Sequence, residues 1–276
     1  MTLLTVRDLH VTFDTEAGRV EAVRGVSFSV GRERLGIVGE SGSGKTMTGR
    51  SVLRLIRPPG RIGAAEMTFD GIDLMGAGEA QMRGLRGRRI AMVMQDPKYS
   101  LNPVMRVGQQ LTEGLRQRDG LGRAEARAKA VEALAAVQIR DPDRVMDAYP
   151  HELSGGMGQR VMIAMMLIPN PDLLIADEPT SALDVTVQAE VLAILDRLVR
   201  DRGMGLIFIS HDLRLVARFC DRVLVMYKGR IVEELAAGDL TRAQHPYTRG
   251  LLNCLPRIGG ARGALPVLDR SASWAG

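Results

Sequence analysis

The chain has 276 residues, of which 45% are hydrophobic and 25% charged, a composition typical of soluble globular proteins and unlike that of disordered, collagen-like or disulfide-scaffold chains. The formal net charge of +5 permits a nucleic-acid or anionic-membrane partner without demanding one. The two cysteines are too few for a disulfide framework, and the longest apolar run, residues 161–168, is too short to cross a bilayer. The first residues lack the pattern of a signal peptide, so we expect a cytosolic protein.

Short segments of alternating or wholly apolar residues predict five strands in the first third of the chain. These segments are residues 3–13, 25–30, 35–38, 65–69 and 90–94. The third strand leads into the glycine-rich stretch GESGSGKT at 39–46, and helical spacing follows over 47–56. The order of strand, glycine loop and helix is therefore predicted near the start of the chain.

Residues 96–150 have a helical pattern, clearest over 124–137, and contain no convincing strand, so we interpret them as an inserted helical subdomain. Another helix is predicted from the stretch LSGGMGQR at 153–160 up to residue 168. Three wholly apolar runs separated by helical segments then predict central strands of a mostly parallel sheet that is buried on both faces. These runs are residues 173–176, 206–209 and 223–226. The tail from about residue 240 has a less regular pattern.

The stretch GESGSGKT fits G-x-x-x-x-G-K-[ST], with the strand before it and the helix after it that this phosphate-binding motif requires. Its glycines let successive backbone N–H groups point at phosphate oxygens near the positive end of the following helix. Lys45 would reach the β- and γ-phosphates, and the hydroxyl of Thr46 would bind Mg²⁺. A glycine-rich turn without a ligand is the plain alternative. The predicted nucleotide-binding residues of this segment are Gly39, Glu40, Ser41, Gly42, Ser43, Gly44, Lys45, Thr46 and Met47.

The stretch LLIADEP at 173–179 places two carboxylates at the carboxyl end of a predicted buried strand, where open α/β sheets bind their ligands. Asp177 can hold Mg²⁺ through water. Glu178 is suitably placed to orient or deprotonate the water that attacks the γ-phosphate. Alone this pattern is often a polar turn, but together with the glycine loop it favours nucleotide hydrolysis.

With LSGGMGQR added, the chain resembles the ATP-binding cassette (ABC) ATPases, whose signature reads LSGGQ. Met157 replaces the glutamine, whereas Ser154, Gly155 and Gly156 match the family. A hydroxyl residue followed by two glycines and a helix is compatible with a second anion site, although a helix cap without a ligand has the same pattern. The resemblance implies that these four residues contact the nucleotide held by the opposite subunit.

Further positions match the family one by one. Gln95 matches the Q-loop glutamine, which the resemblance implies contacts Mg²⁺ or its water, and His211 matches the switch histidine, which would hydrogen-bond the γ-phosphate. Asp184, in the stretch SALD, matches the D-loop and would bridge to the other subunit. Phe13 lies where the family has an aromatic residue that stacks on adenine. The alternatives are that Phe13 is an ordinary core residue or that Phe28 takes this place.

The resemblance therefore implies an α/β fold with a P-loop NTPase (nucleoside triphosphatase) core of the RecA type, with a mostly parallel sheet, an antiparallel β subdomain and an inserted α-helical subdomain. The implied parts are a first core segment, a helical signature subdomain, a second core segment and a tail, at residues 1–95, 96–153, 154–239 and 240–276. The implied catalytic residues are Lys45, Gln95, Glu178 and His211. The implied Mg²⁺ ligands are Thr46, Gln95 and Asp177.

A finer resemblance, to the importer ATPases for oligopeptides, dipeptides and nickel, rests on QDPKYSLNPVMRVGQQ, LIADEPTSALDVTVQAEVL and the tail HPYTRGLLNCLPR. It implies ATP and Mg²⁺ as cofactors, permease subunits docked near 95–107, a second ABC ATPase subunit and a solute-binding protein. The place implied is the cytoplasmic face of the inner membrane, and we favour peptide over nickel as cargo. Some members hold a four-cysteine iron–sulfur cluster in the tail. Cys254 is the only cysteine there, so we expect no such cluster.

Two other functions fit part of the sequence. The basic charge would suit a cassette ATPase that acts on nucleic acid or ribosomes, but such proteins usually carry two cassettes or a long coiled-coil insertion. The insertion over 96–150 is too short for such an arm, and we expect no nucleic-acid partner. An inactive nucleotide-binding regulator is disfavoured because both Lys45 and Glu178 are present.

Overall fold

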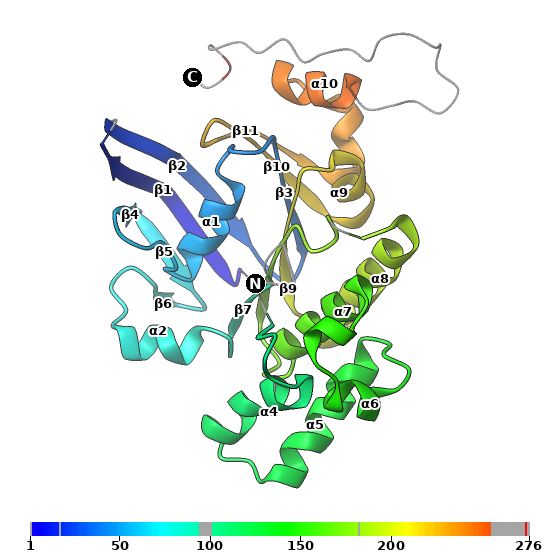
Figure 1. Cartoon of the computed structure of the whole chain (residues 1–276). Coiled ribbons are helices and arrows are strands. Elements are labelled where there is room, and N and C mark those ends of the chain that lie inside the picture. Colours follow the sequence, from blue (N-terminus) through cyan, green and yellow to red (C-terminus); the bar gives the residue numbers. More distant parts are fainter. Residues whose placement is uncertain (1, 17, 94–100, 182, 255–273, 275–276) are drawn as a thin grey trace. The chain divides into compact units, whose positions relative to one another are not determined.

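The computed structural model describes residues 2–16, 18–93, 101–181, 183–254 and 274. The chain forms two compact units. Unit 1 comprises Met1–Gly78 and Ile207–Gly276, and unit 2 comprises Glu79–Leu206, so the boundary falls inside one strand. In the described part of the chain, no helix combines the length and the apolar character needed to cross a membrane. Figure 1 labels the helices and strands that follow.

An antiparallel sheet forms the first part of unit 1. Its strands are β1 (Leu4–Thr15), β2 (Gly18–Val30), β4 (Gly60–Gly63), β5 (Glu66–Phe69) and β6 (Ile72–Asp73). They are ordered β2-β1-β5-β6, and β4 also pairs with β1. The strands predicted over 3–13, 25–30 and 65–69 are confirmed. β2 begins at Gly18, well before the predicted start at residue 25. The prediction missed these first residues because they are exposed on a two-stranded hairpin and show no alternation of apolar and polar side chains.

The rest of unit 1 contributes strands in the order β11-β10-β3-β9. Their bounds are β3 (Arg34–Val38), β9 (Gly205–Ser210), β10 (Arg222–Tyr227) and β11 (Arg230–Ala236). β3 and β10 are parallel, whereas β11 is antiparallel to β10. The apolar side chains of β3, β9 and β10 are buried, which confirms the strands predicted over 35–38, 206–209 and 223–226. The accompanying helices are α1 (Lys45–Val52), α9 (Leu213–Phe219), the 3₁₀ helix η2 (Ala237–Arg242) and α10 (Pro246–Asn253).

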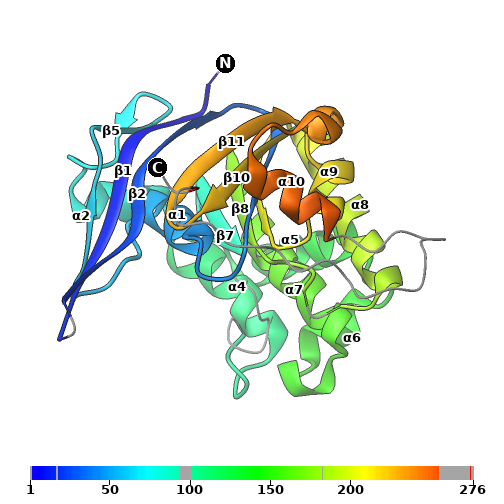
Figure 2. The ribbon, with the colours of Figure 1, turned by 90° about the horizontal axis from the view of Figure 1, so that it is seen from above.

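Two predictions in unit 1 need correction. The helix expected over 47–56 ends at Val52, because Arg54 adopts a left-handed backbone conformation with φ of 51° and its guanidinium donates to the carbonyls of Leu74 and Ala77. The tail is also more regular than its sequence indicated, since η2 and α10 lie within it. In Figure 2, α10 lies beside β10 and β11.

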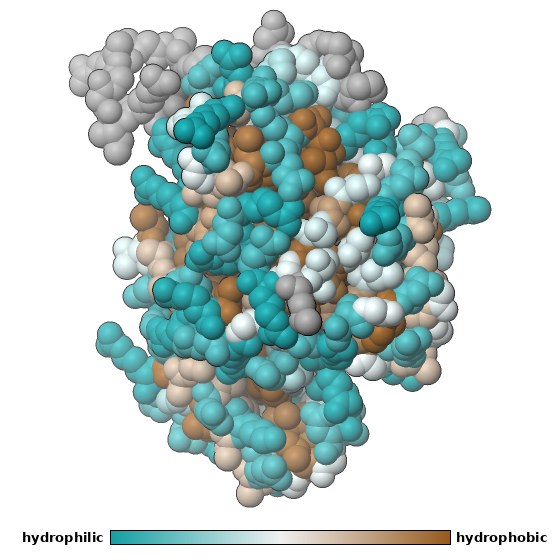
Figure 3. Space-filling model, turned by 180° about the vertical axis from the view of Figure 1, so that it is seen from behind, coloured by the Kyte–Doolittle hydropathy of each residue, from teal (hydrophilic) through white to brown (hydrophobic). Residues whose placement is uncertain are grey.

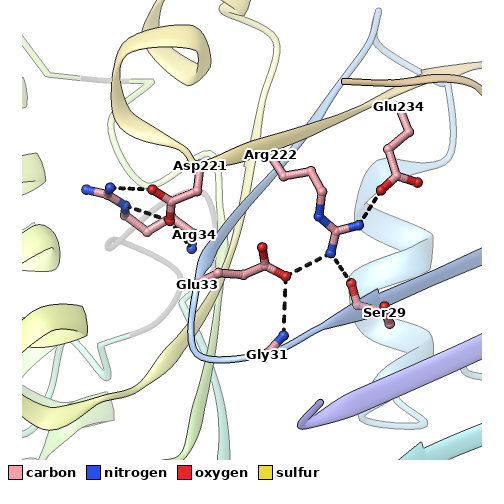
Figure 4. A network of polar contacts seen from close by, with 7 residues as sticks. All are labelled: Ser29, Gly31, Glu33, Arg34, Asp221, Arg222 and Glu234. Atoms are coloured by element: carbon pink, nitrogen blue, oxygen red, sulfur yellow. Dashed lines mark hydrogen bonds and ion pairs between the residues drawn. The ribbon is translucent and has the colours of Figure 1, made fainter. Parts of the chain in front are cut away.

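A network of charged side chains joins the start of β3 to β10 and β11 (Figure 4). Arg34 donates to Asp221 from its backbone N–H at 2.8 Å and from its guanidinium at 2.5 Å. Arg222 binds Glu33 at 2.8 Å and also pairs with Glu234. Partial burial alone would lower the pKa of Arg222, but the two glutamates outweigh it and raise that pKa. These ion pairs hold β3 in place at the end far from the glycine loop.

Unit 2 is mainly helical. Its helices are α2 (Glu79–Leu85), α4 (Val107–Gln117), α5 (Arg123–Ala136), α6 (Pro142–Asp147), the 3₁₀ helix η1 (Pro150–Glu152), α7 (Gly155–Leu167) and α8 (Val185–Arg202). Its strands β7 (Ile90–Val93) and β8 (Leu173–Asp177) are parallel and wholly buried. The described residues 101–150 contain no strand, as predicted, and the helices expected over 124–137 and up to 168 are α5 and α7.

The fold class is therefore confirmed as α/β, with an antiparallel sheet, strands in parallel pairs, and a group of helices. The division of the chain at residues 95, 153 and 239 into functional parts stays a prediction. Hydrophilic side chains cover most of the face drawn in Figure 3, with hydrophobic ones in smaller patches between them.

Candidate functional site

The glycine loop connects β3 to α1 in unit 1, and close neighbours surround it. Gly44 has φ of 103°, and a Cβ atom there would lie 2.6 Å from the carbonyl oxygen of Ala22 on β2. A Cβ atom on Gly39 would lie 2.2 Å from the carbonyl oxygen of Met226 on β10. Both positions require glycine, because side chains of L-residues would meet backbone atoms that cannot move aside.

Lys45 is the first residue of α1 and is 5% exposed. Its ammonium group lies inside the loop, where it donates to the carbonyl oxygens of Gly39 at 2.7 Å and Glu40 at 2.9 Å. The N–H of Ser43 donates to the carbonyl of Glu40, which closes the loop. Thr46 and Met47 follow in the first turn of α1 and are half-buried. The loop thus carries a positive charge within its ring of backbone groups, an arrangement suited to an anion.

His211 belongs to the same site. It follows β9 directly, and it lines a cavity of about 440 Å³ together with the loop. The other lining residues are Gly39, Glu40, Ser41, Gly42, Ser43, Tyr227, Lys228 and Leu251. The next residue, Asp212, accepts hydrogen bonds from the N–H groups of Arg214 and Leu215 and so begins α9. The short link between β9 and this cap fixes where His211 stands.

The two phenylalanines differ in environment. Phe28 on β2 is 6% exposed and pairs with the apolar face of β1, as expected of a core residue. Phe13 on β1 is half-buried and pairs with Val20, two residues before the Ala22 carbonyl that faces Gly44. Phe13 is therefore the phenylalanine with an accessible ring on the hairpin beside the loop. Its role in stacking stays a prediction.

The two carboxylates of LLIADEP lie where β8 ends in unit 2. Asp177 is the last residue of β8 and is 3% exposed, whereas Glu178 is half-buried. Glu178 has φ of 47°, a left-handed conformation that costs a residue other than glycine about 1–2 kcal/mol. Its carbonyl accepts from the N–H of Ser181 at 3.3 Å and from the Ser181 hydroxyl at 3.2 Å. Strain of this kind is concentrated at functional sites.

Asp184 has a local role that the sequence did not reveal. Its carboxylate accepts from the N–H groups of Thr186 at 3.1 Å and Val187 at 3.0 Å, so Asp184 is the N-cap of α8. Gln188, in the first turns of α8, donates from its side chain to the hydroxyl of buried Thr180, which precedes Asp184, at 3.1 Å. The segment between β8 and α8 is thus held by its own side chains. A bridge from Asp184 to another subunit stays a prediction.

The signature stretch begins α7 in unit 2. The hydroxyl of Ser154 accepts from the N–H of Met157 at 3.3 Å and caps the helix. A Cβ atom on Gly155 would meet nothing within 4 Å, whereas one on Gly156 would lie 2.6 Å from Val187 on α8. Met157 is 37% exposed. The signature residues line a cavity of about 790 Å³ with residues of α6 and α8.

Gln95 lies outside the described residues, so its contacts stay a prediction. Within the described ranges, no three His, Cys, Asp or Glu side chains are grouped closely enough to hold a metal ion. Burial raises the pKa of the Cys220 thiol to about 12, so this cysteine is not a reactive thiolate at neutral pH.

Sequence reasoning missed Tyr227, Lys228 and Leu251 as neighbours of the loop. The available signal was the sequence His245-Pro246 in the tail, because a proline after a capping side chain marks the start of a helix. It would have predicted α10, but not the place where α10 packs.

Comparisons with known proteins agree with this geometry. A family model described as ABC transporter matches residues 23–181. Over 270 residues the chain is 50% identical to the probable peptide ABC transporter ATP-binding protein y4tR of Sinorhizobium fredii, which covers 96% of this chain and 81% of that protein. It is 50% identical over 258 residues to the oligopeptide transport ATP-binding protein OppD of Escherichia coli, covering 93% of this chain and 76% of OppD. The dimeric post-hydrolysis structure of the ATP-binding cassette MJ0796, bound to ADP and Pi, matches with a TM-score of 0.76 and 26% identity, over 85% of this chain and 99% of that one.

Proposed function

The chain belongs to the ABC transporter family as an ATP-hydrolysing subunit, and we propose that the transporter it drives is an importer of peptides. The observation that carries this proposal is identity of 50% to two peptide-transport ATP-binding proteins over at least 93% of the chain.

We assign to unit 1 the contacts with the nucleotide that this chain itself binds. The loop from Gly39 to Met47 would bind the phosphates of ATP, with Lys45 supplying positive charge where its ammonium already lies. His211, on the same cavity, would hydrogen-bond the γ-phosphate, and Phe13 would stack on adenine.

We assign hydrolysis to Glu178, which would orient and deprotonate the attacking water. Thr46, Asp177 and Gln95 would hold Mg²⁺ directly or through water. A hydroxyl, a buried carboxylate and an amide are the oxygen donors that Mg²⁺ prefers, and this ion takes few protein ligands because ATP phosphates and water complete its shell. When bound, Mg²⁺ neutralises charge that develops on the phosphates.

We further propose that two ABC subunits close head to tail, each binding one ATP with its loop and contacting the other ATP through Ser154, Gly155, Gly156 and Met157. The exposed surface of Met157 and the open space around Gly155 support this role, because both leave the signature accessible. The MJ0796 structure is dimeric. Asp184 would bridge the pair.

The partners that follow are permease subunits, a second ABC ATPase subunit and, indirectly, a solute-binding protein. The chain would then be a peripheral protein on the cytoplasmic face of the inner membrane.

Replacing the proposed base tests the chemistry. Glu178→Gln keeps the shape of the side chain, so it should leave the dissociation constant for ATP within twofold and slow hydrolysis at least about 100-fold, the scale of losing a general base. The matched control is Glu132→Gln on the exposed side of α5, which should hydrolyse ATP at the wild-type rate. Hydrolysis by Glu178→Gln within a few-fold of wild type would remove Glu178 from this role.

Isolation from its own membranes tests the partners. The tagged protein, purified after gentle solubilisation, should bring multi-span permease chains, and mass spectrometry would show whether a second ABC subunit accompanies them. Recovery of ribosomal or DNA-associated proteins without a permease would overturn the transporter proposal and leave only the ATPase chemistry.

A further inference from the structure

Helix α10 of unit 1 is hydrogen-bonded to the phosphate loop by the side chain of Tyr247. Tyr247 is fully buried, and its hydroxyl oxygen accepts a hydrogen bond from the backbone N–H of Glu40 at 3.0 Å. Glu40 is the second residue of the loop, and its carbonyl in turn accepts from Lys45. A residue of the tail, 207 positions further along the chain, thus fixes a backbone group of the nucleotide site.

The start of α10 is anchored so that Tyr247 has a defined position. The His245 side chain accepts from the N–H of Tyr247 at 3.2 Å, and Pro246 occupies the first helical position. The carboxylate of Glu233 on β11 accepts from the N–H groups of Gln244 at 2.6 Å and His245 at 3.2 Å. Partial burial alone would raise the pKa of Glu233, but the hydrogen bonds to its carboxylate lower it, so Glu233 stays charged at neutral pH.

Three aromatic side chains, Tyr227, Tyr247 and Trp274, form a group that we call the aromatic cluster. The rings of Tyr227 and Tyr247 lie 4.4 Å apart between centroids, and Trp274 lies 6.1 Å from the first and 6.2 Å from the second. These separations are in the range of favourable aromatic contacts. The cluster therefore connects α10 to the end of β10.

The turn after β10 holds the other side of the loop. Tyr227 is the last residue of β10, and two residues later the N–H of Gly229 donates to the carbonyl of Ser43 at 3.0 Å. The loop is thus held at Glu40 by α10 and at Ser43 by this turn. Both supports meet in the contact between Tyr227 and Tyr247.

We propose that Tyr247 is a positioning residue for the nucleotide site: through its hydrogen bond to Glu40 it sets the loop conformation that binds ATP, so that the tail tunes nucleotide affinity. A loop already held in its binding conformation loses less conformational freedom when the ligand binds. The inference rests on ATP binding by the loop and is independent of the cargo.

Removing one oxygen atom tests this role. Tyr247→Phe keeps the ring in the aromatic cluster and removes the acceptor for the Glu40 N–H. In the full-length protein it should raise the dissociation constant and the KM for ATP about fivefold, the scale of one net hydrogen bond, with kcat within twofold. Hydrogen exchange at the Glu40 amide should become faster.

The matched control is Tyr149→Phe, which removes the same atom, a tyrosine hydroxyl oxygen, from a half-buried residue of unit 2. It should leave ATP affinity and Glu40 exchange unchanged. A purely structural role for Tyr247 predicts that Tyr247→Phe changes thermal stability while ATP affinity and Glu40 exchange stay at wild-type values. That result would overturn the proposal.

Trp274 offers a direct readout, because it is the single tryptophan of the chain. Its place in the aromatic cluster predicts that ATP changes its fluorescence in the wild type and changes it less in Tyr247→Phe. Equal changes in the two proteins would contradict coupling through Tyr247. Lys45→Ala, which should not bind ATP, shows whether the fluorescence change reports ATP binding at the loop. If wild type and Lys45→Ala respond alike, the assignment of the nucleotide site to the loop fails, and not only the role of Tyr247.

Discussion

The phosphate loop of unit 1 and the signature stretch of unit 2 are both short, glycine-rich segments that precede a helix, yet they are supported differently. The loop is surrounded by backbone atoms of Ala22 and Met226 and is hydrogen-bonded by Tyr247 and Gly229, all distant in sequence. The signature stretch is capped by its own Ser154 at the start of α7, and its inner side, at Gly156 and Arg160, contacts other segments of unit 2.

The two kinds of support predict which substitutions each segment tolerates. The loop owes its shape to remote parts of its own unit, so a change there should alter folding and ATP binding together. The signature stretch leaves Gly155 in open space and Met157 exposed, so a change on its outer surface should leave the fold of this chain intact.

The largest effect is expected at Gly44. Gly44→Ala combines a φ of 103° with a Cβ atom 2.6 Å from a backbone oxygen, and it should cost about 3 kcal/mol in the free energy of unfolding, the upper range for a strained backbone, and prevent ATP binding. Urea denaturation and ATP titration measure both. Gly42→Ala is the control, since its φ of 79° is also positive but no atom lies within 4 Å of the new Cβ. Equal losses in the two variants would show that the enclosing backbone is unimportant.

A smaller loss is expected inside the signature stretch. Gly156→Ala should cost about 1–3 kcal/mol, because its Cβ atom would lie 2.6 Å from the Val187 side chain and overpack the contact between α7 and α8. Gly155→Ala should leave unfolding unchanged within about 0.5 kcal/mol. The double variant Gly156→Ala with Val187→Ala should recover part of the loss. No recovery would contradict overpacking as the cause.

The Arg34–Asp221 pair should affect stability without reaching the loop, because it lies at the opposite end of β3. Partial burial alone would raise the pKa of Asp221, but hydrogen bonds and charge from Arg34 lower it below its ordinary value of 3.8. The pair therefore stabilises the fold above that value, and this stability is lost as the pH falls through the lower, folded-state pKa. Asp221→Asn should lower the free energy of unfolding by about 0.2–1 kcal/mol at pH 7 and leave ATP affinity unchanged. It should also remove the part of the stability that the wild type loses as the pH falls. A change in ATP affinity would mean that the loop depends on this end of β3.

The smallest effect is expected for Met157→Gln, which introduces the residue of the family signature. Because Met157 is 37% exposed, the free energy of unfolding should change by less than about 0.5 kcal/mol, and ATP affinity of the isolated chain should stay within twofold. A large loss of stability would show that Met157 is part of the core of unit 2, against the contrast drawn above.

Sequence patterns predicted the fold well where burial is regular. The strands β3, β8, β9 and β10 were found because wholly buried strands are short continuous apolar runs. The helices α5 and α7 were found because α5 is rich in helix-forming residues and α7 follows a capping serine. The end of α1 was misplaced because it depends on Arg54, whose guanidinium reaches carbonyls some 20 residues away. Local sequence carries no record of such a contact.

The site shows the same division. Lys45 and His211 were predicted from motifs and lie on the same unit beside the loop. Tyr247 and Gly229 were missed, because their role arises only from the packing of α10 and the β10–β11 turn against the loop. The capping role of Asp184 was missed for a different reason. The family motif gives Asp184 a contact with another subunit, whereas its carboxylate also caps the helix that follows it in this chain.

Peptide uptake by the reconstituted transporter is the direct measurement of whether this ATPase drives peptide import. The complex purified with this chain would be placed in liposomes with ATP and a binding protein, and uptake of a labelled short peptide would be compared with uptake of nickel. We predict ATP-dependent peptide uptake that Glu178→Gln abolishes and Glu132→Gln leaves intact. Uptake of nickel without peptide would contradict peptide as the cargo, and peptide uptake that persists in Glu178→Gln would contradict its dependence on hydrolysis at Glu178.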